Sequence, residues 1–485
     1  MKRNVVLVFL AINVLSAIVR AQTVGPGQSP ALPWRANAID GTDARVAPRA
    51  GPLAVSGDLD TTFGTSGKYL STLSGESMFG PAVAVAVDGR IIVAGKHFNG
   101  ADDDFALLKL TAAGALDRSP EVFSFSSGKN EDAKSVLALA DGRIVMGGEG
   151  NAGTYAQHGL MRFLSNGSLD TSFGSGGKVS VDFGRPSHMH EVIEQLDGKL
   201  VVIGDSYGGV TSAKLAMARL NVNGSLDTTF GTAGLVQVSY GDSTNGHTVV
   251  VDAEGRLTVG GYLENTTKSP ASACFVARFT ANGVADTTFG TGGSTVVQVG
   301  TDAFANFCHH MVLQSDGKTV IAGGRVRVGI GDFIAARFTT AGQLDTSFDG
   351  DGVVITPFTG GGEASAIVLQ PDGKLILGGY ANGKFALARY GTTGALDTTF
   401  GTSGTTSFAF GLGVNDQIKS LALQPDGKIV AAGYSRSSTS VFSLAVVRLA
   451  NDSGGAERRA KPLGGLLELL DLFNVFDGST TEHKR

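Results

Sequence analysis

Residues Leu169–Gly174 read LDTSFG, and close copies of this hexapeptide return along the chain. The copies lie at Leu59–Gly64, Leu226–Gly231, Ala285–Gly290, Leu344–Asp349 and Leu396–Gly401, with a more divergent copy at Leu116–Glu121. A catalytic site needs its residues only once, whereas a scaffold is built from many copies of one unit. The hexapeptide therefore indicates a repeated structural unit, and functional residues are expected where the copies differ.

Each repeat also contains a two-residue turn between two β-rich segments. In the second repeat, Lys134–Ala140 and Arg143–Gly148 are predicted strands joined by Asp141-Gly142. Asp-Gly is typical of a type I′ hairpin turn, because both central residues of that turn need positive φ. The same kind of turn is found at Asp88-Gly89, Asp197-Gly198, Glu254-Gly255, Asp316-Gly317, Asp372-Gly373 and Asp426-Gly427, which predicts seven repeats.

Two further strands complete each repeat: one that ends in Lys or Arg, and one after the hexapeptide, as at Lys178–Val181 and Leu235–Val238. We call the four strands a to d in chain order. The a and b strands are apolar on both faces, and a single four-stranded sheet cannot bury both. A closed ring of such sheets can. The sequence therefore predicts an all-β, seven-bladed β-propeller of four-stranded antiparallel blades over residues 57–450.

The repeat region begins and ends with incomplete repeats. It starts with a d strand at Lys68–Leu73 and ends with a c strand at Phe442–Leu449, so the N-terminal d strand is expected to join the C-terminal a–c strands. In the continuous repeats the basic residue of strand c stands eight residues before the acid of the hexapeptide: Lys109 and Asp117, Arg162 and Asp170, Arg219 and Asp227, Arg278 and Asp286, Arg337 and Asp345, Arg389 and Asp397. Asp60 and Arg448 lack such partners, which predicts that they pair with each other and close the ring. The alternative is that both are solvated surface charges.

The repeated set of motifs resembles the delta-60 repeat family. The resemblance rests on LDTTFG followed by GK, on the QPDGK segments Gln370–Lys374 and Gln424–Lys428, and on the ALARY and VVRL strands at Ala386–Tyr390 and Val446–Leu449. It covers residues 57 to about 450. It implies a propeller of largely bacterial, often exported proteins without an agreed activity, so it adds to the fold and compartment and little to the chemistry.

The two ends of the chain differ in composition from the repeats. Met1–Ala21 is interpreted as a secretory signal, with Lys2 and Arg3 before the apolar run Val5–Val19. The alternative is an uncleaved N-terminal anchor. Residues 22–56 are expected to be a linker, and residues 451–485 a separate tail with a short amphipathic helix at about 463–476 that docks on the propeller or on a partner. We therefore predict a secreted protein, extracellular or periplasmic, without a transmembrane span after signal cleavage.

Composition narrows the classes of partner and the redox chemistry. The net charge of −5, with charged residues at 17%, argues against a nucleic-acid binder, which needs a basic face. Cys274 and Cys308 are the two cysteines and start strands in adjacent blades. We expect two buried thiols there, with a disulfide as the alternative.

The candidate site residues come from one position of strand a, seven residues before the acid of the turn. The residues there are Pro81, Lys134, His190, His247, His309, Ser365 and Lys419. Three histidines in consecutive blades suggest a divalent metal such as zinc, with a ligand position left open for water. Glu191 and Glu194 are the candidate general bases beside such a metal. The alternative is that these histidines bind loop backbone in a polar channel mouth.

These patterns leave three functional readings open. The leading one is an exported, non-catalytic binding or scaffold protein that takes a protein or glycan on the face carrying the variable b–c loops Lys96–Asp104, Asp205–Lys214 and Tyr262–Ala273. The second is a metal-dependent lyase or hydrolase that uses His190, His247 and His309. The third is a structural cell-envelope protein whose tail helix mediates assembly.

Overall fold

The computed structural model describes residues 56–71, 78–126, 128–150, 154–208, 212–264, 271–300, 304–327, 330–411, 413–437 and 442–451. The predicted signal, the linker up to residue 55 and the tail helix lie outside these residues. The described residues form 28 strands and no α-helix. Within this part of the chain no helix is therefore available that could cross a membrane.

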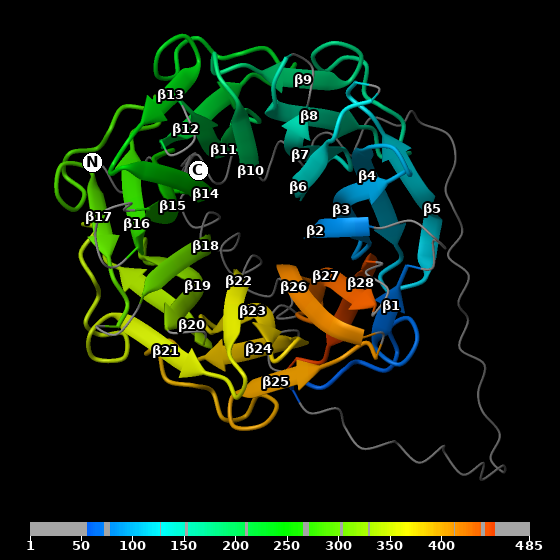
Figure 1. Ribbon diagram of the computed structural model, residues 1–485, viewed down its shortest axis with the longest axis vertical. Helices are drawn as coiled ribbons and strands as arrows, with labels where there is room; N and C mark the ends of the chain where they lie inside the picture. The colour runs from blue at the N-terminus through cyan, green and yellow to red at the C-terminus, as the bar shows by residue number, and fades with distance from the viewer. Residues whose placement is uncertain are drawn as a thin grey trace, which may run out of the picture. The chain divides into compact units, whose positions relative to one another are not determined.

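Seven antiparallel blades are arranged around a central channel (Figure 1). Blade 1 contains β2 (Met78–Val85), β3 (Ile91–Phe98), β4 (Asp103–Leu110) and β5 (Leu116–Phe123). Blade 2 contains β6 (Asp132–Ala138), β7 (Ile144–Gly150), β8 (Gln157–Phe163) and β9 (Lys178–Val181). Blade 3 contains β10 (Ser187–Glu194), β11 (Leu200–Tyr207), β12 (Ala213–Leu220) and β13 (Leu235–Val238).

The remaining blades follow the same order of strands. Blade 4 contains β14 (Ser243–Val251), β15 (Leu257–Glu264), β16 (Ser272–Phe279) and β17 (Ser294–Val297). Blade 5 contains β18 (Ala305–Leu313), β19 (Thr319–Arg327), β20 (Ile330–Phe338) and β21 (Val353–Pro357). Blade 6 contains β22 (Gly362–Leu369), β23 (Leu375–Ala381), β24 (Lys384–Tyr390) and β25 (Thr405–Phe408). Blade 7 contains β26 (Gly413–Leu423), β27 (Ile429–Ser437), β28 (Phe442–Leu449) and β1 (Lys68–Leu70).

Blade 7 is assembled from both ends of the repeat region. Strand β1 lies antiparallel to β28, with Lys68 opposite Val447 and Leu70 opposite Ala445. This strand ends at Leu70, earlier than the predicted Leu73, although the amide of Ser71 still donates to a carbonyl of β28. The N-terminal segment thus supplies the d strand that the C-terminal repeat lacks.

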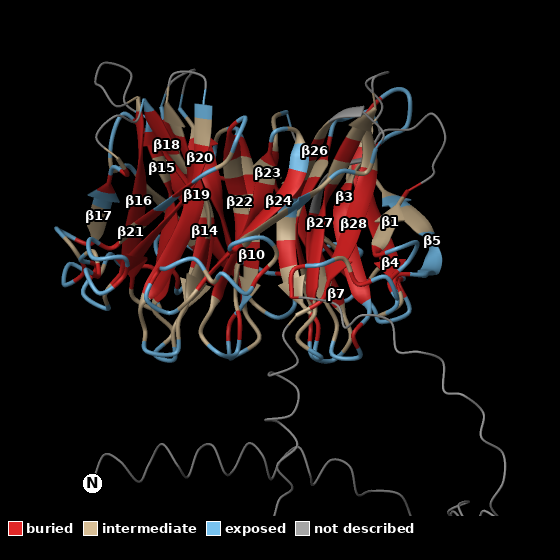
Figure 2. Cartoon of the chain, turned by 90° about the horizontal axis from the view of Figure 1, so that it is seen from below, coloured by how far each residue is buried: buried red, intermediate tan, exposed pale blue. Residues whose placement is uncertain are grey.

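The hydrophobic core is divided among the blade interfaces. The seven apolar clusters of the described residues each combine two neighbouring blades, and one of them joins blade 7 to blade 1. Figure 2 shows the consequence: many strands are largely buried, outer strands such as β1 and β5 are intermediate or exposed, and further exposed residues lie in the turns at either end. Both faces of the b strands are therefore core, as in β11 and β15, which explains why they do not alternate between apolar and polar residues. The a strands, such as β6 and β10, differ from the expectation, because buried residues alternate in part with less buried ones along them.

The two cysteines form a disulfide, so the expectation of free thiols is wrong. Cys274 on β16 and Cys308 on β18 have Cα atoms 5.4 Å apart. A parallel bridge between Ser272 and Ala305 brings blades 4 and 5 together at this place. The resulting Cα separation lies within the range that a disulfide can span. The bond therefore cross-links two adjacent blades.

Candidate functional site

Every a strand contains a register irregularity at the candidate position. In six blades one residue is skipped by the pairing with strand b, which is the mark of a β-bulge. The skipped residues are Lys134, His190, His247, His309, Ser365 and Lys419. In blade 1 the pairing skips from Phe79 to Ala82. The position aligned in the sequence is therefore a ring of bulges around the channel.

Glycine in strand b makes room for these bulges. A Cβ built on Gly204 would lie 1.9 Å from the carbonyl oxygen of His188, and one on Gly379 would lie 1.9 Å from the carbonyl oxygen of Glu363. The same close approach occurs at Gly148, Gly261, Gly323 and Gly433. Any larger residue would push the a strand away. The Gly in strand b was the sequence signal for the bulge, and our sequence analysis missed it.

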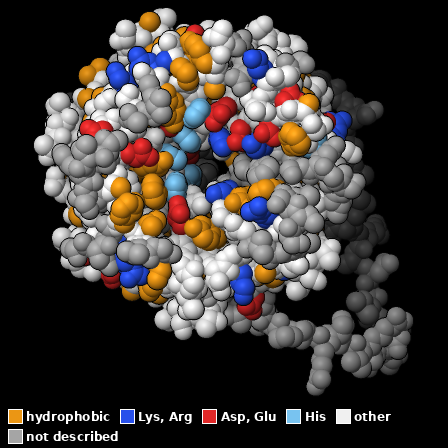
Figure 3. Space-filling view, in the orientation of Figure 1, with side chains coloured by type: hydrophobic (Ala, Val, Ile, Leu, Met, Phe, Trp, Pro, Cys, Tyr) orange, Lys and Arg blue, Asp and Glu red, His pale blue; other side chains and the backbone are white. Residues whose placement is uncertain are grey.

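The bulged residues surround a cavity of about 630 Å³ at one mouth of the channel. Figure 3 shows the histidines gathered at this opening, with acidic and basic side chains around them. Six of the bulged residues line the cavity, together with Glu191, His310, Glu363, Tyr380 and Gln417. At the bulge the site therefore presents lysine on blades 2 and 7, histidine on blades 3 to 5 and serine on blade 6.

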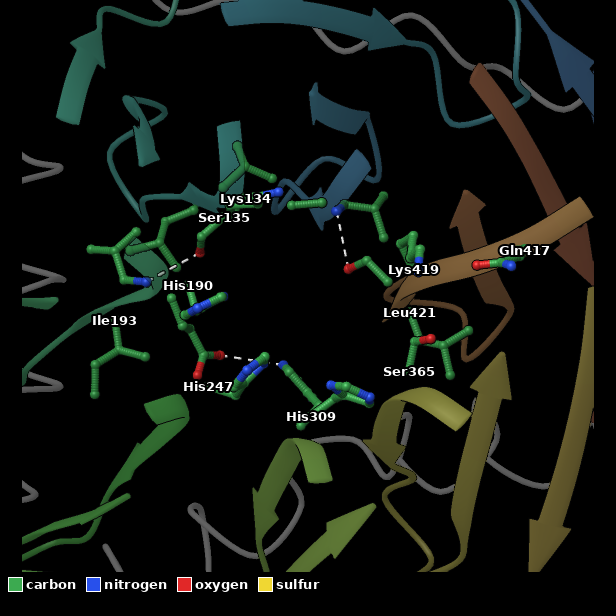
Figure 4. Close-up of a pocket in the computed structure, with 18 of the residues that line it drawn as sticks. Lys134, Ser135, His190, Ile193, His247, His309, Ser365, Gln417, Lys419 and Leu421 are labelled. Carbon is green, nitrogen blue, oxygen red and sulfur yellow. Dashed lines mark hydrogen bonds and ion pairs between the residues drawn. The ribbon is translucent and has the colours of Figure 1, made fainter. Parts of the chain in front are cut away.

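The imidazoles of His190, His247 and His309 lie next to one another along one wall (Figure 4). The rings of His190 and His247 are stacked with centroids 4.1 Å apart, and those of His247 and His309 meet edge to face at 5.3 Å. Burial holds the pKa of His247 well below its usual value, and the nearby charges of His190, His309 and Lys134 lower it further. His247 is therefore a neutral imidazole at physiological pH.

The outer two histidines are engaged by carboxylates. Nε2 of His190 is 3.1 Å from Oδ2 of the buried Asp205 on β11, and Nε2 of His309 is 2.6 Å from Oε1 of Glu363 on β22. No group of three or more His, Cys, Asp or Glu in the described part of the chain is arranged to hold a metal ion. The rings of His190 and His247 stack, and the Nε2 atoms of His190 and His309 face carboxylates of different blades. The zinc site expected at the three histidines stays a prediction.

Glu191 and Glu194, the candidate general bases, have different surroundings in the structure. Oε2 of Glu191 accepts a hydrogen bond from the amide of Val249 in the next blade at 2.7 Å, and Oε1 lies 3.3 Å from Nε2 of His310. Burial opposes the charged form of His310, but its hydrogen bond to Glu191 and the charge of Glu191 raise its pKa. Glu194 is exposed and is not part of the cavity wall. Glu191 is therefore occupied by contacts that hold blades 3, 4 and 5 together.

Glu191 represents a recurring contact that sequence reasoning missed. The residue after the bulge reaches the amide two residues after the bulge in the next blade. Ser420 binds the amide of Val83, Ser135 that of Val192 and Thr248 that of Met311, at 3.1 to 3.2 Å. We call these four residues, Ser135, Glu191, Thr248 and Ser420, the clasp residues. They satisfy amides on the inner edge of the a strands.

The arginines paired with the hexapeptide acids are also structural. Nε of the arginine lies 2.7 to 2.9 Å from the carboxylate in Arg162–Asp170, Arg219–Asp227, Arg278–Asp286, Arg337–Asp345, Arg389–Asp397 and Arg448–Asp60. In most of these pairs Nη1 also donates to a backbone carbonyl of the following blade, such as Val222 for Arg162. Blade 1 differs, because Asp117 lies 3.6 Å from Arg90 and does not pair with Lys109. These pairs connect blades, and the alternative of solvated surface charges is not observed.

Comparison with known proteins agrees with the propeller fold. Seven stretches match the family model described as "Domain of unknown function (DUF5122) beta-propeller": residues 88–119, 139–173, 195–230, 253–289, 314–348, 370–400 and 424–453. Each match runs from the a–b turn region into or just past the c–d corner of one blade. The name delta-60 is not part of that description. No curated protein matches the chain significantly.

Several solved structures are similar at low identity. YCF48 bound to D1 peptide is 8% identical, with a TM-score of 0.45, over 82% of this chain and 98% of that one. The polysaccharide lyase Uly1 is 10% identical, with a TM-score of 0.48, over 82% of this chain and 98% of that one. The β-propeller domain of Vanderwaltozyma polyspora Nup133 is 8% identical, with a TM-score of 0.41, over 78% and 100%. At these values no ligand or activity is transferred to this chain.

Proposed function

We propose that this propeller, with its seven matches to the DUF5122 model, is an exported, non-catalytic binding protein that takes its ligand in the cavity at the channel mouth. The observation that carries the proposal is the ring of bulges. One backbone geometry is repeated around the channel, while the side chains that it presents change from Lys134 to the histidines, Ser365 and Lys419. A rigid scaffold with variable side chains on one face suits recognition.

Two further observations support export and the type of partner. The Cys274–Cys308 disulfide is the chemistry of an oxidising compartment, which agrees with the predicted signal. The net charge of −5 favours a protein or glycan over nucleic acid. The metal-dependent lyase or hydrolase is not favoured, because its three histidines face carboxylates and each other. The assembly role of the tail helix falls outside the described residues and stays a prediction.

Two tryptophan substitutions test the binding site. Ser365→Trp places a large ring in the cavity, and Leu196→Trp adds the same ring to an exposed turn that is not part of the cavity wall. Ligands are first identified with the unmodified protein on glycan and peptide arrays. We expect binding to survive Leu196→Trp and to be lost in Ser365→Trp, with both variants folded by circular dichroism. Equal binding by the two variants, or no ligand on either array, would refute the proposal.

A further inference from the structure

Lys419 brings a positive charge to the cavity without a close acidic partner. It is the bulged residue of β26 and is solvent-exposed inside the mouth. Its ammonium lies 5.8 Å from the ring centroid of Tyr434, and no ion pair within 4.0 Å joins it to any carboxylate among the described residues. The protein atoms around the channel mouth partly desolvate the ammonium of Lys419, which lowers its pKa, while the charge of Glu363 raises it and that of Lys134 lowers it further. An anion placed beside Lys419 would relieve this repulsion.

Lys134 lies at the equivalent position two blades away. It is the bulged residue of β6 and pairs with Asp132 on the same strand at 2.5 Å. In blade 1, which stands between blades 7 and 2, the positions skipped by the pairing are Gly80 and Pro81, and neither residue type carries a charge. Figure 4 shows Lys134 and Lys419 entering the cavity from these two sides. The sector between them is a place for a ligand carboxylate.

The opposite wall presents flat rings and groups that both donate and accept. His190, His247 and His309 form the row of imidazoles, and Tyr380, Ser365 and Gln417 continue the lining. A neutral imidazole, a hydroxyl and an amide can each donate one hydrogen bond and accept another. Sugar hydroxyls need both roles from their surroundings. The apolar C–H face of a sugar ring also packs well on an aromatic ring.

A peptide that adds a strand to the channel fits less well. Such a peptide needs free amides on the inner edge of an a strand. The clasp residues already occupy the amides of Val83, Val192, Val249 and Met311 on this edge. In each of blades 1, 3, 4 and 5 one amide of the inner edge is therefore already bonded, which favours a ligand that binds through side chains.

We propose that the mouth cavity binds an acidic saccharide, with a ring carboxylate held between Lys134 and Lys419 and a sugar face packed on the histidine row. The inference rests on the proposed function and narrows its ligand to one chemical class. The carboxylate would make charge-assisted hydrogen bonds to the two ammonium groups. Neutral His247 would donate and accept hydrogen bonds with the sugar hydroxyls.

Isothermal titration calorimetry with two matched ligands tests whether the carboxylate of the ligand contributes to binding. One is a uronic-acid trisaccharide, and the other is the neutral trisaccharide of the same linkage with hydroxymethyl groups in place of the carboxylates. We expect the acidic trisaccharide to bind, and the neutral one to bind at least about tenfold more weakly. Lys419→Met keeps the apolar stem and should weaken binding of the acidic ligand by about 10- to 100-fold. Lys384→Met removes the same charge outside the cavity and should change nothing.

The possible failures are distinguishable. Equal affinity for the two trisaccharides, unchanged in Lys419→Met and in Lys134→Met, would overturn the carboxylate assignment and leave the binding site itself in place. If neither trisaccharide binds while an acidic peptide binds in a Lys419-dependent way, the saccharide class is wrong. If Ser365→Trp leaves binding of every array ligand intact, the proposed function fails as well. Thermal unfolding of Lys419→Met checks that any loss of binding is not a loss of fold.

Discussion

The closure of the ring depends on Asp60, and Asp60→Asn is the perturbation that tests it. Oδ2 of Asp60 lies 2.9 Å from Nε of Arg448 and 3.2 Å from Nζ of Lys428, and Oδ1 accepts hydrogen bonds from the amide and hydroxyl of Thr62. Arg448 is 388 residues away in the sequence, so this contact joins the two ends of the repeat region. Asp60→Asn removes the charge and keeps the size of the side chain.

The expected cost follows from the pKa of Asp60. Burial alone would raise that pKa, but the hydrogen bonds from Thr62, the contact with Lys428 and the charge of Arg448 lower it from 3.8 to about 2. This shift corresponds to about 2 kcal/mol of stability at neutral pH. Because the folded pKa is the lower one, the contribution is complete above pH 4 and is lost as the pH falls through about 2. Asp60→Asn should therefore destabilise by about 2 kcal/mol at pH 7 and by little at pH 2.

A matched control exists inside a continuous blade. Asp227 has the same set of contacts: Nε of Arg219 at 2.8 Å, Nζ of Lys199 at 3.0 Å, and the amide and hydroxyl of Thr229. Asp227→Asn should cost a similar amount. There, however, the acid follows its arginine by eight residues, so an opened contact closes again readily. The N-terminal segment that carries Asp60 has no such short tether.

Amide hydrogen exchange separates closure from a local effect. The amide of Arg448 donates to Gly67 and the amide of Arg219 donates to Gly234, which are equivalent bonds in the two blades. In Asp60→Asn we expect the protection factor of the Arg448 amide against hydrogen exchange to fall about 30-fold, while that of the Arg219 amide is unchanged. In Asp227→Asn we expect a smaller loss at Arg219. Equal changes at both amides in both variants would refute the idea that Asp60 closes the ring.

Three further outcomes follow from the described contacts. Replacing Cys274 and Cys308 together by Ala should lower the free energy of unfolding by about 4 kcal/mol in urea titrations, from the sequence separation of 34 residues, and should abolish the effect of reducing agent. Burial lowers the pKa of His158 to about 3, so the stability that its neutral form contributes is complete above pH 6.5 and is lost as the pH falls towards 3. His158→Gln should therefore reduce the loss of unfolding free energy between pH 6.5 and pH 3 by up to about 5 kcal/mol, measured as urea midpoints. An unchanged pH dependence of the midpoint in this variant would contradict the prediction. Thr248→Val leaves the amide of Met311 without its acceptor and should lower the free energy of unfolding by about 1–3 kcal/mol. An unchanged free energy of unfolding would show that Thr248 does not stabilise the ring through this contact.

Local patterns were sufficient for the blade architecture. The d strands Lys178–Val181 and Leu235–Val238 and the c strand Phe442–Leu449 have the predicted bounds.

The a–b turns are not the predicted type I′ turns, because only the glycine of each pair, such as Gly142, has positive φ. The amide of Gly142 donates to the carbonyl of Leu139, and the amide of Leu139 donates to the carbonyl of Arg143, which is a three-residue loop with glycine in its left-handed position. Such a glycine-containing loop still determines the local backbone within a few residues. The constant eight-residue interval between Arg and Asp is also a local pattern. Asp60 and Arg448 were predicted to pair because each lacks a partner at that interval.

The candidate site depended on contacts between blades, which no local pattern contains. The sequence placed His190, His247 and His309 at one level of the channel. It did not show that their rings stack, or that Asp205 and Glu363 face their nitrogens. Those directions are decided by bulges opposite glycines in strand b and by the packing of the neighbouring blade.

The repeat, the number of blades and the pairing of the chain ends were therefore determined by the sequence alone, because hairpin turns and short apolar strands are specified within a few residues. The disulfide, the clasp residues and the direction of each side chain at the mouth were decided by tertiary structure. Each of these depends on contacts between residues of adjacent blades, and such contacts form only when the blades are assembled into the ring.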